Sequence, residues 1–326
     1  MRYHRAVLAP LFFCVIATPS AAQSQTYPAK PIRIISATPS GTSGDIAIRL
    51  SSPLMAAALG QPVIIDSRPA AGGQVAAVAV KQAPSDGYTA LISASAPMVT
   101  NRYLVKSVPY DTLVDFTPIS KVISVPSIFV ITAALPVNSV AEFVDYAKKN
   151  PGKIAFGSTG NGTAFHMIGE SISMETGIRM LHVPYAAQGM AQPVADLATD
   201  RIQALFPTVA SLGAQAKTGK VKILAVFDRT RQRQIPDVPA ISELYPSYAI
   251  LPSWFGLMAP AGLPGAIALR LQSELRAALR NAEVSAKLDS LGTTPVGNSP
   301  AEFAEEVRMD IATVGRITKA LGIEPQ

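Results

Sequence analysis

Short apolar runs alternate with amphipathic segments along most of the chain. The apolar residues 32–36 precede a glycine-containing turn, a helical pattern over residues 46–59 that stops at Gly60, and a second apolar run at residues 62–65. Runs of this length between helical segments are typical of buried strands in a parallel sheet. The pattern therefore predicts an α/β fold with a largely parallel sheet. Pro53, inside the first helical segment, is expected to kink or shorten that helix.

The same alternation continues through the next turn, helix and strand, which are expected at residues 68–73, 74–82 and 88–93. Two later helices carry clear start signals. Ser139 and Glu142 have the spacing of a capping box, in which side-chain oxygens accept hydrogen bonds from N–H groups at the start of a helix. Ser299 and Glu302 repeat this spacing, with a proline at the first helical position. This second box predicts a final helix that runs to about Leu321.

Two extended apolar stretches, at residues 127–132 and 253–258, are interpreted as strands that carry the chain from one domain to another. Each stretch follows a proline, and no low-complexity linker divides the sequence. At roughly 100 to 200 residues per domain, the length favours two domains. We therefore expect a signal segment at residues 1–22, a discontinuous first domain of residues 23–127 plus 252–326, and a second domain of residues 128–251.

The start of the sequence has the pattern of a secretory signal that is cleaved after about Ala22. Arg2 and Arg5 precede an apolar stretch over residues 6–17, and small residues follow at positions 20–22. The single cysteine, Cys14, lies inside this stretch. We therefore expect a mature protein without disulfide bonds or thiolate chemistry, which depends on its hydrophobic core for stability.

Charge adds a mild preference for anionic ligands. Without Arg2 and Arg5, the 28 Lys and Arg residues fall to 26 against 22 Asp and Glu, a formal charge of +4. Nucleic acid is not expected as a partner, because the basic residues are scattered along the chain. The one dense basic run, at residues 229–233, has no aromatic residues interleaved with it.

Two segments rich in glycine, serine and threonine describe the same kind of structure in different parts of the chain. Residues 36–45 and residues 157–163 each follow an apolar run and precede a helical pattern. A strand–turn–helix unit of this kind directs backbone N–H groups, hydroxyls and the positive end of the helix dipole to one place, which suits a carboxylate or phosphate. The two turns therefore predict an anion site with one wall from each.

No cluster of residues near either turn predicts a reaction. His166 and His182 are the only histidines after residue 22, and neither has a third ligand or an orienting carboxylate at a useful spacing. We assign both to structural roles and expect no metal site. Ser158 is not in a nucleophile-elbow pattern, and the turn at residues 157–163 lacks the lysine of a P-loop. These features favour capture of an anion without catalysis and without a cofactor.

A series of short motifs stands in a fixed order along the chain. They are YPAKPIR at 27–33, GQPV at 60–63, PSDGYT at 84–89, VPYD at 108–111, NPGK at 150–153, HVPY at 182–185, PDVP at 236–239 and WFG at 254–256. In this order and spacing, the chain resembles the substrate-binding proteins of tripartite tricarboxylate transporters, often called the Bug family. The resemblance covers essentially the whole chain after the signal segment.

The resemblance implies a two-domain periplasmic-binding-protein fold, type II-like, with a ligand cleft between domains that two crossing strands join. It implies a periplasmic solute-binding protein, not an enzyme, that closes on a small organic carboxylate and delivers it to integral-membrane transporter subunits. We expect a monomer. The implied ligand-binding positions lie on three turns and the motif that ends at residue 185: Thr38, Ser40, Gly41, Thr42, Ser93, Ala94, Ser95, Ser158, Thr159, Asn161, Gly162, Thr163 and Tyr185.

The chain departs from the family pattern in three places. Residues 38–40, Thr-Pro-Ser, replace an aromatic residue followed by two prolines, which leaves a roomier or wetter pocket. Residues 186–188 after Tyr185 contain no basic residue, so a basic contact from that loop is not expected. Pro207 stands where many relatives have an acidic residue, which disfavours an amino-acid ligand. Tyr185 and Trp254 fit either a cleft position or core packing.

Two readings from other classes of protein stay open at this point. The closed state could be presented to a membrane sensor kinase rather than to a transporter, or the chain could be a secreted hydrolase. A transporter gene beside this one would favour uptake, and turnover of a ligand would favour the hydrolase. Both aliphatic di- and tricarboxylates and aromatic acids are compatible with the motifs.

Overall fold

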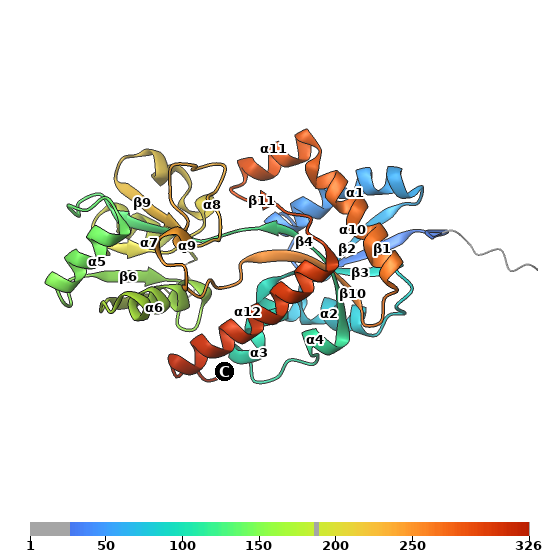
Figure 1. The fold of residues 1–326 in the computed structure, drawn as a ribbon, viewed down its shortest axis with the longest axis horizontal. Coiled ribbons are helices and arrows are strands. Elements are labelled where there is room, and N and C mark those ends of the chain that lie inside the picture. Colours follow the sequence, from blue (N-terminus) through green and yellow to red (C-terminus); the bar gives the residue numbers. More distant parts are fainter. Residues whose placement is uncertain (1–26, 186–188, 326) are drawn as a thin grey trace, which may run out of the picture.

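The computed structural model describes residues 27–185 and 189–325, and these form two α/β domains, each built on its own sheet (Figure 1). The predicted signal segment and residues 186–188 lie outside the described residues. The first sheet has the strand order β11-β4-β10-β3-β1-β2. Its strands are β1 (Ile32–Ser36), β2 (Val63–Ser67), β3 (Thr89–Ala94), β4 (Phe116–Ser124), β10 (Trp254–Pro260) and β11 (Thr294–Pro295).

Helices cover both faces of the first sheet because its inner strands are apolar on both sides. Ile34 of β1 packs in one hydrophobic cluster and the adjacent Ile35 in another. The first cluster includes α1 (Ser43–Leu59), α10 (Gly265–Arg280) and α11 (Ala282–Ser290). The second includes residues of α2 (Gln74–Lys81), η2 (Ala96–Thr100) and α12 (Pro300–Ala320), and α3 (Asn101–Leu104) packs against it. The other short helices of this domain are η1 (Ala70–Gly73) and α4 (Thr112–Asp115).

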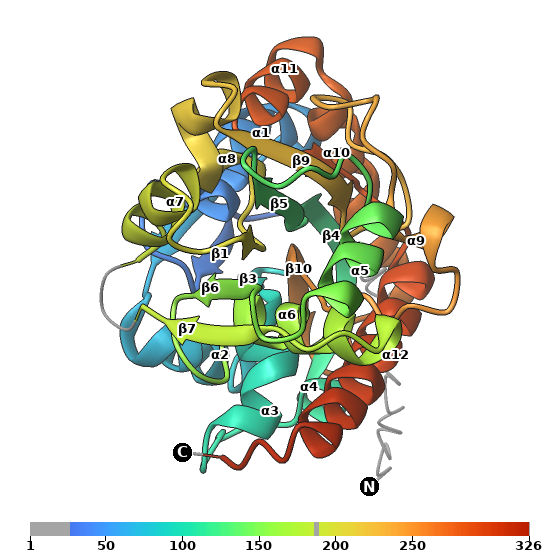
Figure 2. The same ribbon diagram turned by 90° about the vertical axis from the view of Figure 1, so that its left-hand side faces the viewer.

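The second sheet has the order β7-β6-β8-β5-β9, and Figure 2 views this domain from its outer end. Its strands are β5 (Ile128–Thr132), β6 (Ala155–Ser158), β7 (Leu181–Pro184), β8 (Ala204–Leu205) and β9 (Val221–Val226). Its helices are α5 (Val140–Lys149), α6 (Ala164–Thr176), α7 (Ala191–Ala198), α8 (Val209–Leu212), η3 (Gly213–Lys217) and α9 (Ile241–Leu244). Phe129 of β5 lies at the centre of this domain, with its ring against Phe143 and Phe206.

Both sheets are mixed rather than largely parallel. Strand β1 pairs in parallel with β2 and β3, whereas β10 is antiparallel to both β3 and β4. In the second sheet, β6 is parallel to β7 and β8, whereas β5 is antiparallel to β8 and β9. The antiparallel strands are those near the crossings between the domains. Strand β10 re-enters the first sheet from the second domain, and so it runs opposite to the strands on either side of it.

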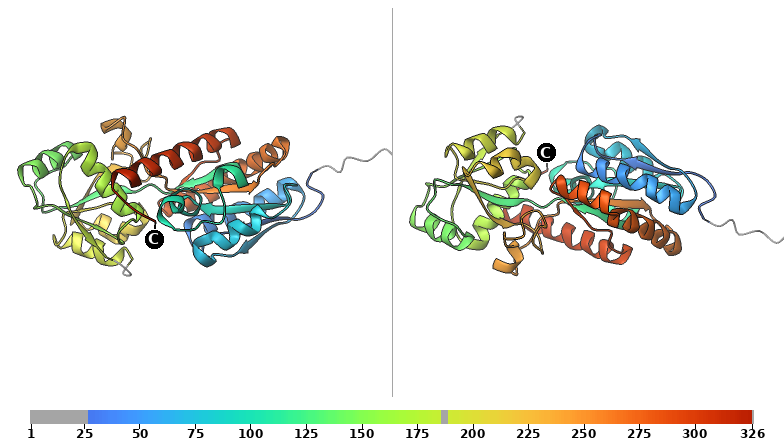
Figure 3. Two further views of the ribbon diagram at one scale, coloured as in Figure 1. Left: turned by 90° about the horizontal axis from the view of Figure 1, so that it is seen from below. Right: turned by 90° about the horizontal axis from the view of Figure 1, so that it is seen from above.

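Two segments carry the chain between the domains, one from β4 to β5 and the other into β10 (Figure 1). They are hydrogen-bonded to each other, because the Val125 N–H donates to the Ser253 carbonyl oxygen at 2.8 Å. The Phe227 N–H also donates to the Ser127 carbonyl oxygen at 2.8 Å. Helix α12 runs from the first sheet towards α6, and the C-terminal end lies where the domains meet (Figure 3).

Helix α1 runs unbroken through Pro53, contrary to the expected kink or early end. A proline has no N–H, so the carbonyl oxygen of Arg49, four residues earlier, loses its usual partner. The hydroxyl of Ser52 donates to that oxygen at 3.2 Å and replaces the missing bond. The helix then ends at Gly60 as predicted, in the left-handed conformation with φ of 69°.

The two predicted capping boxes form to different extents. The Ser299 hydroxyl accepts from the Glu302 N–H, and the Glu302 carboxylate accepts from the Ser299 N–H at 2.8 Å. Ser139 caps α5 in the same way, but the Glu142 carboxylate accepts from Asn138 instead. Within residues 27–185 and 189–325, no helix has the length and apolar character needed to cross a membrane.

Candidate ligand-binding site

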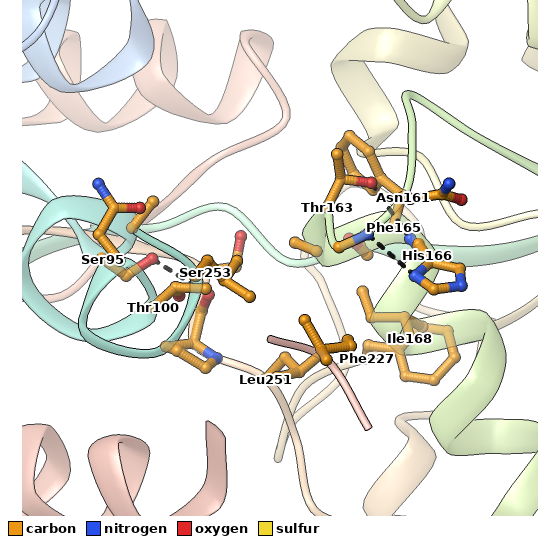
Figure 4. Close-up of a pocket in the computed structure, with 18 of the residues that line it drawn as sticks. Ser95, Thr100, Asn161, Thr163, Phe165, His166, Ile168, Phe227, Leu251 and Ser253 are labelled. Carbon is orange, nitrogen blue, oxygen red and sulfur yellow. Dashed lines mark hydrogen bonds between the residues drawn. The ribbon is translucent and has the colours of Figure 1, made fainter. Parts of the chain in front are cut away.

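A cavity of about 600 Å³ lies between the two domains (Figure 4). Its walls come from the first domain, the second domain and the crossing segments. The first domain contributes Ser95, Ala96, Thr100, Asn101, Leu104, Gly322, Ile323 and Glu324. The second domain contributes Asn161, Gly162, Thr163, Ala164, Phe165, His166, Ile168 and Thr208. The crossing region contributes Ser127, Phe227, Leu251, Pro252 and Ser253.

The glycine-rich turn between β6 and α6 forms the second-domain wall. Gly160 and Gly162 have φ of 130° and 73°, which side-chain-bearing residues rarely adopt. The Thr163 hydroxyl donates to the Gly160 carbonyl oxygen at 2.8 Å and so fixes the turn. Among the described residues, the Ala164 and Phe165 N–H groups have no hydrogen-bond acceptor. The start of α6 therefore offers free donors and the positive end of its dipole to the cavity.

Two histidines support this turn from behind. His166 Nδ1 accepts a hydrogen bond from the Gly162 N–H at 3.1 Å, and the ring also lines the cavity. The His182 ring lies 4.1 Å from it, centre to centre. His182 Nε2 shares a 2.7 Å hydrogen bond with the Ser158 hydroxyl, and its ring stacks on Phe156. The structural role assigned to both histidines matches these contacts, and His166 adds a cavity surface that the sequence did not predict.

Burial lowers the pKa of both histidines, so both rings are neutral near pH 7. The pKa of His182 falls to about 4, first because the ring is desolvated and second because His166 is close. The pKa of His166 is lowered by desolvation. In the unfolded chain each imidazole has its ordinary pKa of about 6.5. Between about pH 6.5 and pH 4 the unfolded state therefore binds more protons, and this contribution to stability is lost as the pH falls.

We expect the His182→Gln variant to lose less stability than the wild type when the pH is lowered. Other groups act in the opposite direction, since burial raises the pKa of Asp310 to about 7 and also raises that of Asp228. The informative quantity is thus the difference between variant and wild type in melting temperature, measured from pH 7.5 to pH 4.5. The melting temperature of the wild type should fall further over this range than that of the variant. Equal losses would mean that His182 is not held neutral by the fold.

The first-domain turn lies at the junction of β1 and α1, and its predicted residues do not line the cavity. Thr38 is buried, and the Thr42 hydroxyl donates to the Pro39 carbonyl oxygen at 2.9 Å. The Gly41 N–H donates to the Asp45 carboxylate at 3.0 Å. Asp45, the acidic residue in the first turn of α1, therefore occupies an N–H group of this turn. Ser40 is exposed beside it.

The third predicted turn, at the end of β3, reaches the cavity only through Ser95. Its hydroxyl donates to the Pro252 carbonyl oxygen at 3.1 Å and so ties the turn to a crossing segment. Ser93 is fully buried, and its hydroxyl donates to the Ala94 carbonyl oxygen at 3.2 Å. In the neighbouring turn, Gly73 packs closely against Ala37. A Cβ at position 73 would lie 2.9 Å from the Ala37 carbonyl oxygen, so this position requires glycine.

Tyr185 and Trp254, for which the sequence allowed either a cleft position or core packing, both form hydrogen bonds outside the cavity. The Tyr185 hydroxyl is 2.8 Å from the Asp196 carboxylate, to which it donates a hydrogen bond. The Trp254 ring is buried edge-on against Phe303, and its Nε1–H donates to Asp310 at 2.7 Å. Neither residue lines the cavity. Trp254 is a core residue at the base of the crossing strand.

The structure thus brings part of the predicted set together in one cavity: Ser95, Asn161, Gly162 and Thr163. The other predicted positions lie outside its lining: Thr38, Ser40, Gly41, Thr42, Ser93, Ala94, Ser158, Thr159 and Tyr185. Their contact with a ligand stays a prediction for a closed arrangement. The lining residues that the sequence missed are mainly apolar, such as Leu104 and Leu251. Pro252, which marks the second crossing, was the one signal that could have pointed to them.

The described residues contain no group of three or more His, Cys, Asp and Glu side chains arranged to hold a metal ion. The donors at the cavity are hydroxyls, the amides of two asparagines and backbone N–H groups, which suit an oxyanion.

Comparison with known proteins gives the family. A family model described as tripartite tricarboxylate transporter family receptor matches residues 47–323. The chain belongs to this receptor family. Protein BugT of Bordetella pertussis, which is 32% identical over 304 residues, spans 91% of this chain, and the match covers 92% of BugT. The resemblance drawn from the short motifs is therefore confirmed.

Solved structures confirm the two-domain periplasmic-binding-protein fold of the family. An R. palustris protein solved with adipate is 30% identical, with a TM-score of 0.69 over 92% of this chain and 100% of that one. Periplasmic binding protein BugD is 27% identical, with a TM-score of 0.65 over 92% and 100%. A TctC solute-binding protein from Polaromonas, solved with no ligand, is 26% identical, with a TM-score of 0.80 over 90% and 100%.

Proposed function

We propose that this protein is a periplasmic receptor that captures a small organic carboxylate by domain closure and delivers it to the membrane subunits of a tripartite tricarboxylate-type transporter. The observation that carries the proposal is the cavity between the domains, lined by hydroxyls and the free N–H groups at the start of α6, in a chain of this receptor family. Such donors hold a carboxylate without chemical change. The protein is accordingly a binding protein rather than an enzyme.

Closure is supported by the arrangement of the two predicted turns. The β6–α6 turn already faces the cavity, whereas the β1–α1 turn lies outside its lining. The structure also superposes better on the Polaromonas relative solved with no ligand than on the R. palustris relative with adipate, although its identity to the former is lower. This difference in superposition is expected if the cleft of the present structure is open. A ligand that touches both turns would favour the closed state, because only that state provides all its contacts.

The sequence before the first domain supports a periplasmic location, because it has the pattern of a secretory signal. Transfer to a transporter is supported by the family membership, since the family is one of transporter receptors. The ligand class is supported by the donors in the cavity and by the adipate in the R. palustris relative.

A calorimetric and thermal-shift panel of carboxylates, amino acids, sugars and nucleotides tests the proposal. The protein without residues 1–22 should first be shown by native mass spectrometry to be free of ligand. A ligand at ~100 times its Kd should add about 2.7 kcal/mol to the free energy of unfolding. We expect responses among carboxylates alone. Responses only to sugars, nucleotides or amino acids would contradict the proposed ligand class, and turnover of a bound compound would contradict the assignment as a binding protein.

A further inference from the structure

Among the described residues, no lysine or arginine lines the cavity between the domains. Its polar donors are neutral and lie on both walls, so that Ser95 and Thr100 of the first domain face Thr163 and the start of α6 on the second-domain side (Figure 4). The imidazole of His166 adds no charge near pH 7, because burial lowers its pKa. This side can neutralise one carboxylate through hydrogen bonds and the helix dipole, but it offers no full positive charge.

Basic residues close to the first-domain turn are already paired with acidic ones. Arg49 Nε donates to the Asp45 carboxylate at 2.9 Å, and Asp45 also accepts from the Gly41 N–H. Arg68 Nε donates to the Asp66 carboxylate at 3.0 Å. Each of these cations would have to give up an acidic partner before it could bind a second ligand carboxylate.

Much of the remaining lining is apolar, beside the hydroxyls of Ser127, Thr208 and Ser253 and the amide of Asn101. Leu104 comes from α3, Phe165 and Ile168 come from α6, Phe227 and Leu251 come from the crossing region, and Ile323 follows α12. A volume of about 600 Å³ is in the range of sites that take a small organic ligand with most of its surface buried. Such a wall favours a hydrocarbon or aromatic body, because burial of apolar surface is favourable and burial of an unpaired charge is costly.

Of the described residues that line the cavity, Glu324 is the only acidic one, and it lies beside this apolar wall. It lies on the segment after α12, next to Ile323, whose N–H donates to the Thr318 carbonyl oxygen at 2.9 Å. The segment is therefore anchored to its helix. A ligand that carried a second carboxylate towards Glu324 would meet a like charge with no cation between them.

We propose that this receptor selects monocarboxylates with an apolar body over dicarboxylates, and that Glu324 disfavours the second carboxylate. The inference rests on the proposed function and narrows its ligand class. It separates this chain from the R. palustris relative that was solved with adipate, a dicarboxylate. Specificity of this kind comes from a repulsive element as much as from attractive contacts.

Hexanoate and adipate make a matched pair for the test, because they share a six-carbon chain and differ only in whether its far end is a methyl group or a carboxylate. Isothermal titration calorimetry of the wild type should give a Kd for hexanoate at least about tenfold lower than for adipate. Phenylpropionate, with an aromatic body, should bind at least as well as hexanoate. Glu324→Gln should strengthen adipate binding more than hexanoate binding and bring the ratio of the two Kd values below about three.

Glu305→Gln is the control, because Glu305 is an exposed residue of α12 outside the cavity lining, and its Kd values should equal those of the wild type. Tighter binding of adipate than of hexanoate by the wild type would overturn the selectivity and leave the proposed function standing. An unchanged ratio in Glu324→Gln would overturn the role of Glu324 alone. Binding of sugars, amino acids or nucleotides, with silence towards all four of hexanoate, phenylpropionate, adipate and citrate, would overturn the proposed function itself.

Discussion

Replacing Asn161 with Trp should weaken carboxylate binding by about 100-fold or more, which corresponds to roughly 2.8 kcal/mol. Asn161 is exposed at the tip of the β6–α6 turn and lines the cavity between the domains. An indole at this position would fill the space that the ligand body needs and hold the domains apart. The ligand found in the carboxylate panel should therefore lose its thermal shift and its calorimetric signal.

The fold should tolerate this change, because the Asn161 side chain takes no part in fixing the turn. Thr163 and His166 do that through hydrogen bonds to Gly160 and Gly162. Asn138→Trp is the matched control, since Asn138 is an exposed asparagine of the same domain outside the cavity lining. Both variants should unfold within a few degrees of the wild type. Wild-type affinity in Asn161→Trp would show that the ligand binds elsewhere.

Phe156→Ala should destabilise the second domain by about 3–5 kcal/mol, the range for truncation of a fully buried phenylalanine. The Phe156 ring is fully buried in β6, stacks on His182 and meets the ring of Phe206 edge-on. It also fills the space above Gly169 of α6, where a Cβ would clash with it. Its loss should loosen the histidine pair behind the turn and so reduce ligand affinity as well.

Differential scanning calorimetry of the ligand-free protein measures this loss of stability. Phe156→Leu keeps much of the volume and should cost less than Phe156→Ala. Val114→Ala, at a residue with 68% of its surface exposed, should stay within about 0.5 kcal/mol of the wild type. A cost below about 1 kcal/mol for Phe156→Ala would mean that neighbouring side chains collapse into the cavity left by the ring.

Local signals in the sequence were enough to predict many elements. The apolar run at residues 32–36 is β1, Gly60 ends α1, and Ser299 starts α12, because each depends on neighbours within a few residues. The expected kink at Pro53 was wrong for the same reason. The missing N–H was visible in the sequence, but the compensating bond from Ser52 to Arg49 depends on a side-chain rotamer that no spacing rule reports.

Strand direction and the shape of the site depended on distant parts of the chain. Strand β10 lies between β3 and β4 although about 130 residues separate it from β4, so the antiparallel pairs could not be deduced from periodicity. The cavity is likewise formed by residues that are far apart in the sequence. Leu104, Phe227 and Ile323 meet there from three remote segments, and each is an ordinary core residue when considered alone. The β6–α6 turn was predictable because its glycines and threonines are contiguous.

The internal hydrogen bonds of the two turns bear on how the empty receptor treats the salts around it. Asp45 already accepts the Gly41 N–H, and His166 already accepts the Gly162 N–H. Chloride or phosphate would find only the N–H groups of Ala164 and Phe165 free, and neither anion brings a body that fills the apolar wall. An organic acid that spans the cleft gains that burial in addition. The resting protein should thus bind inorganic anions more weakly than organic acids, and remain available for scarce solutes.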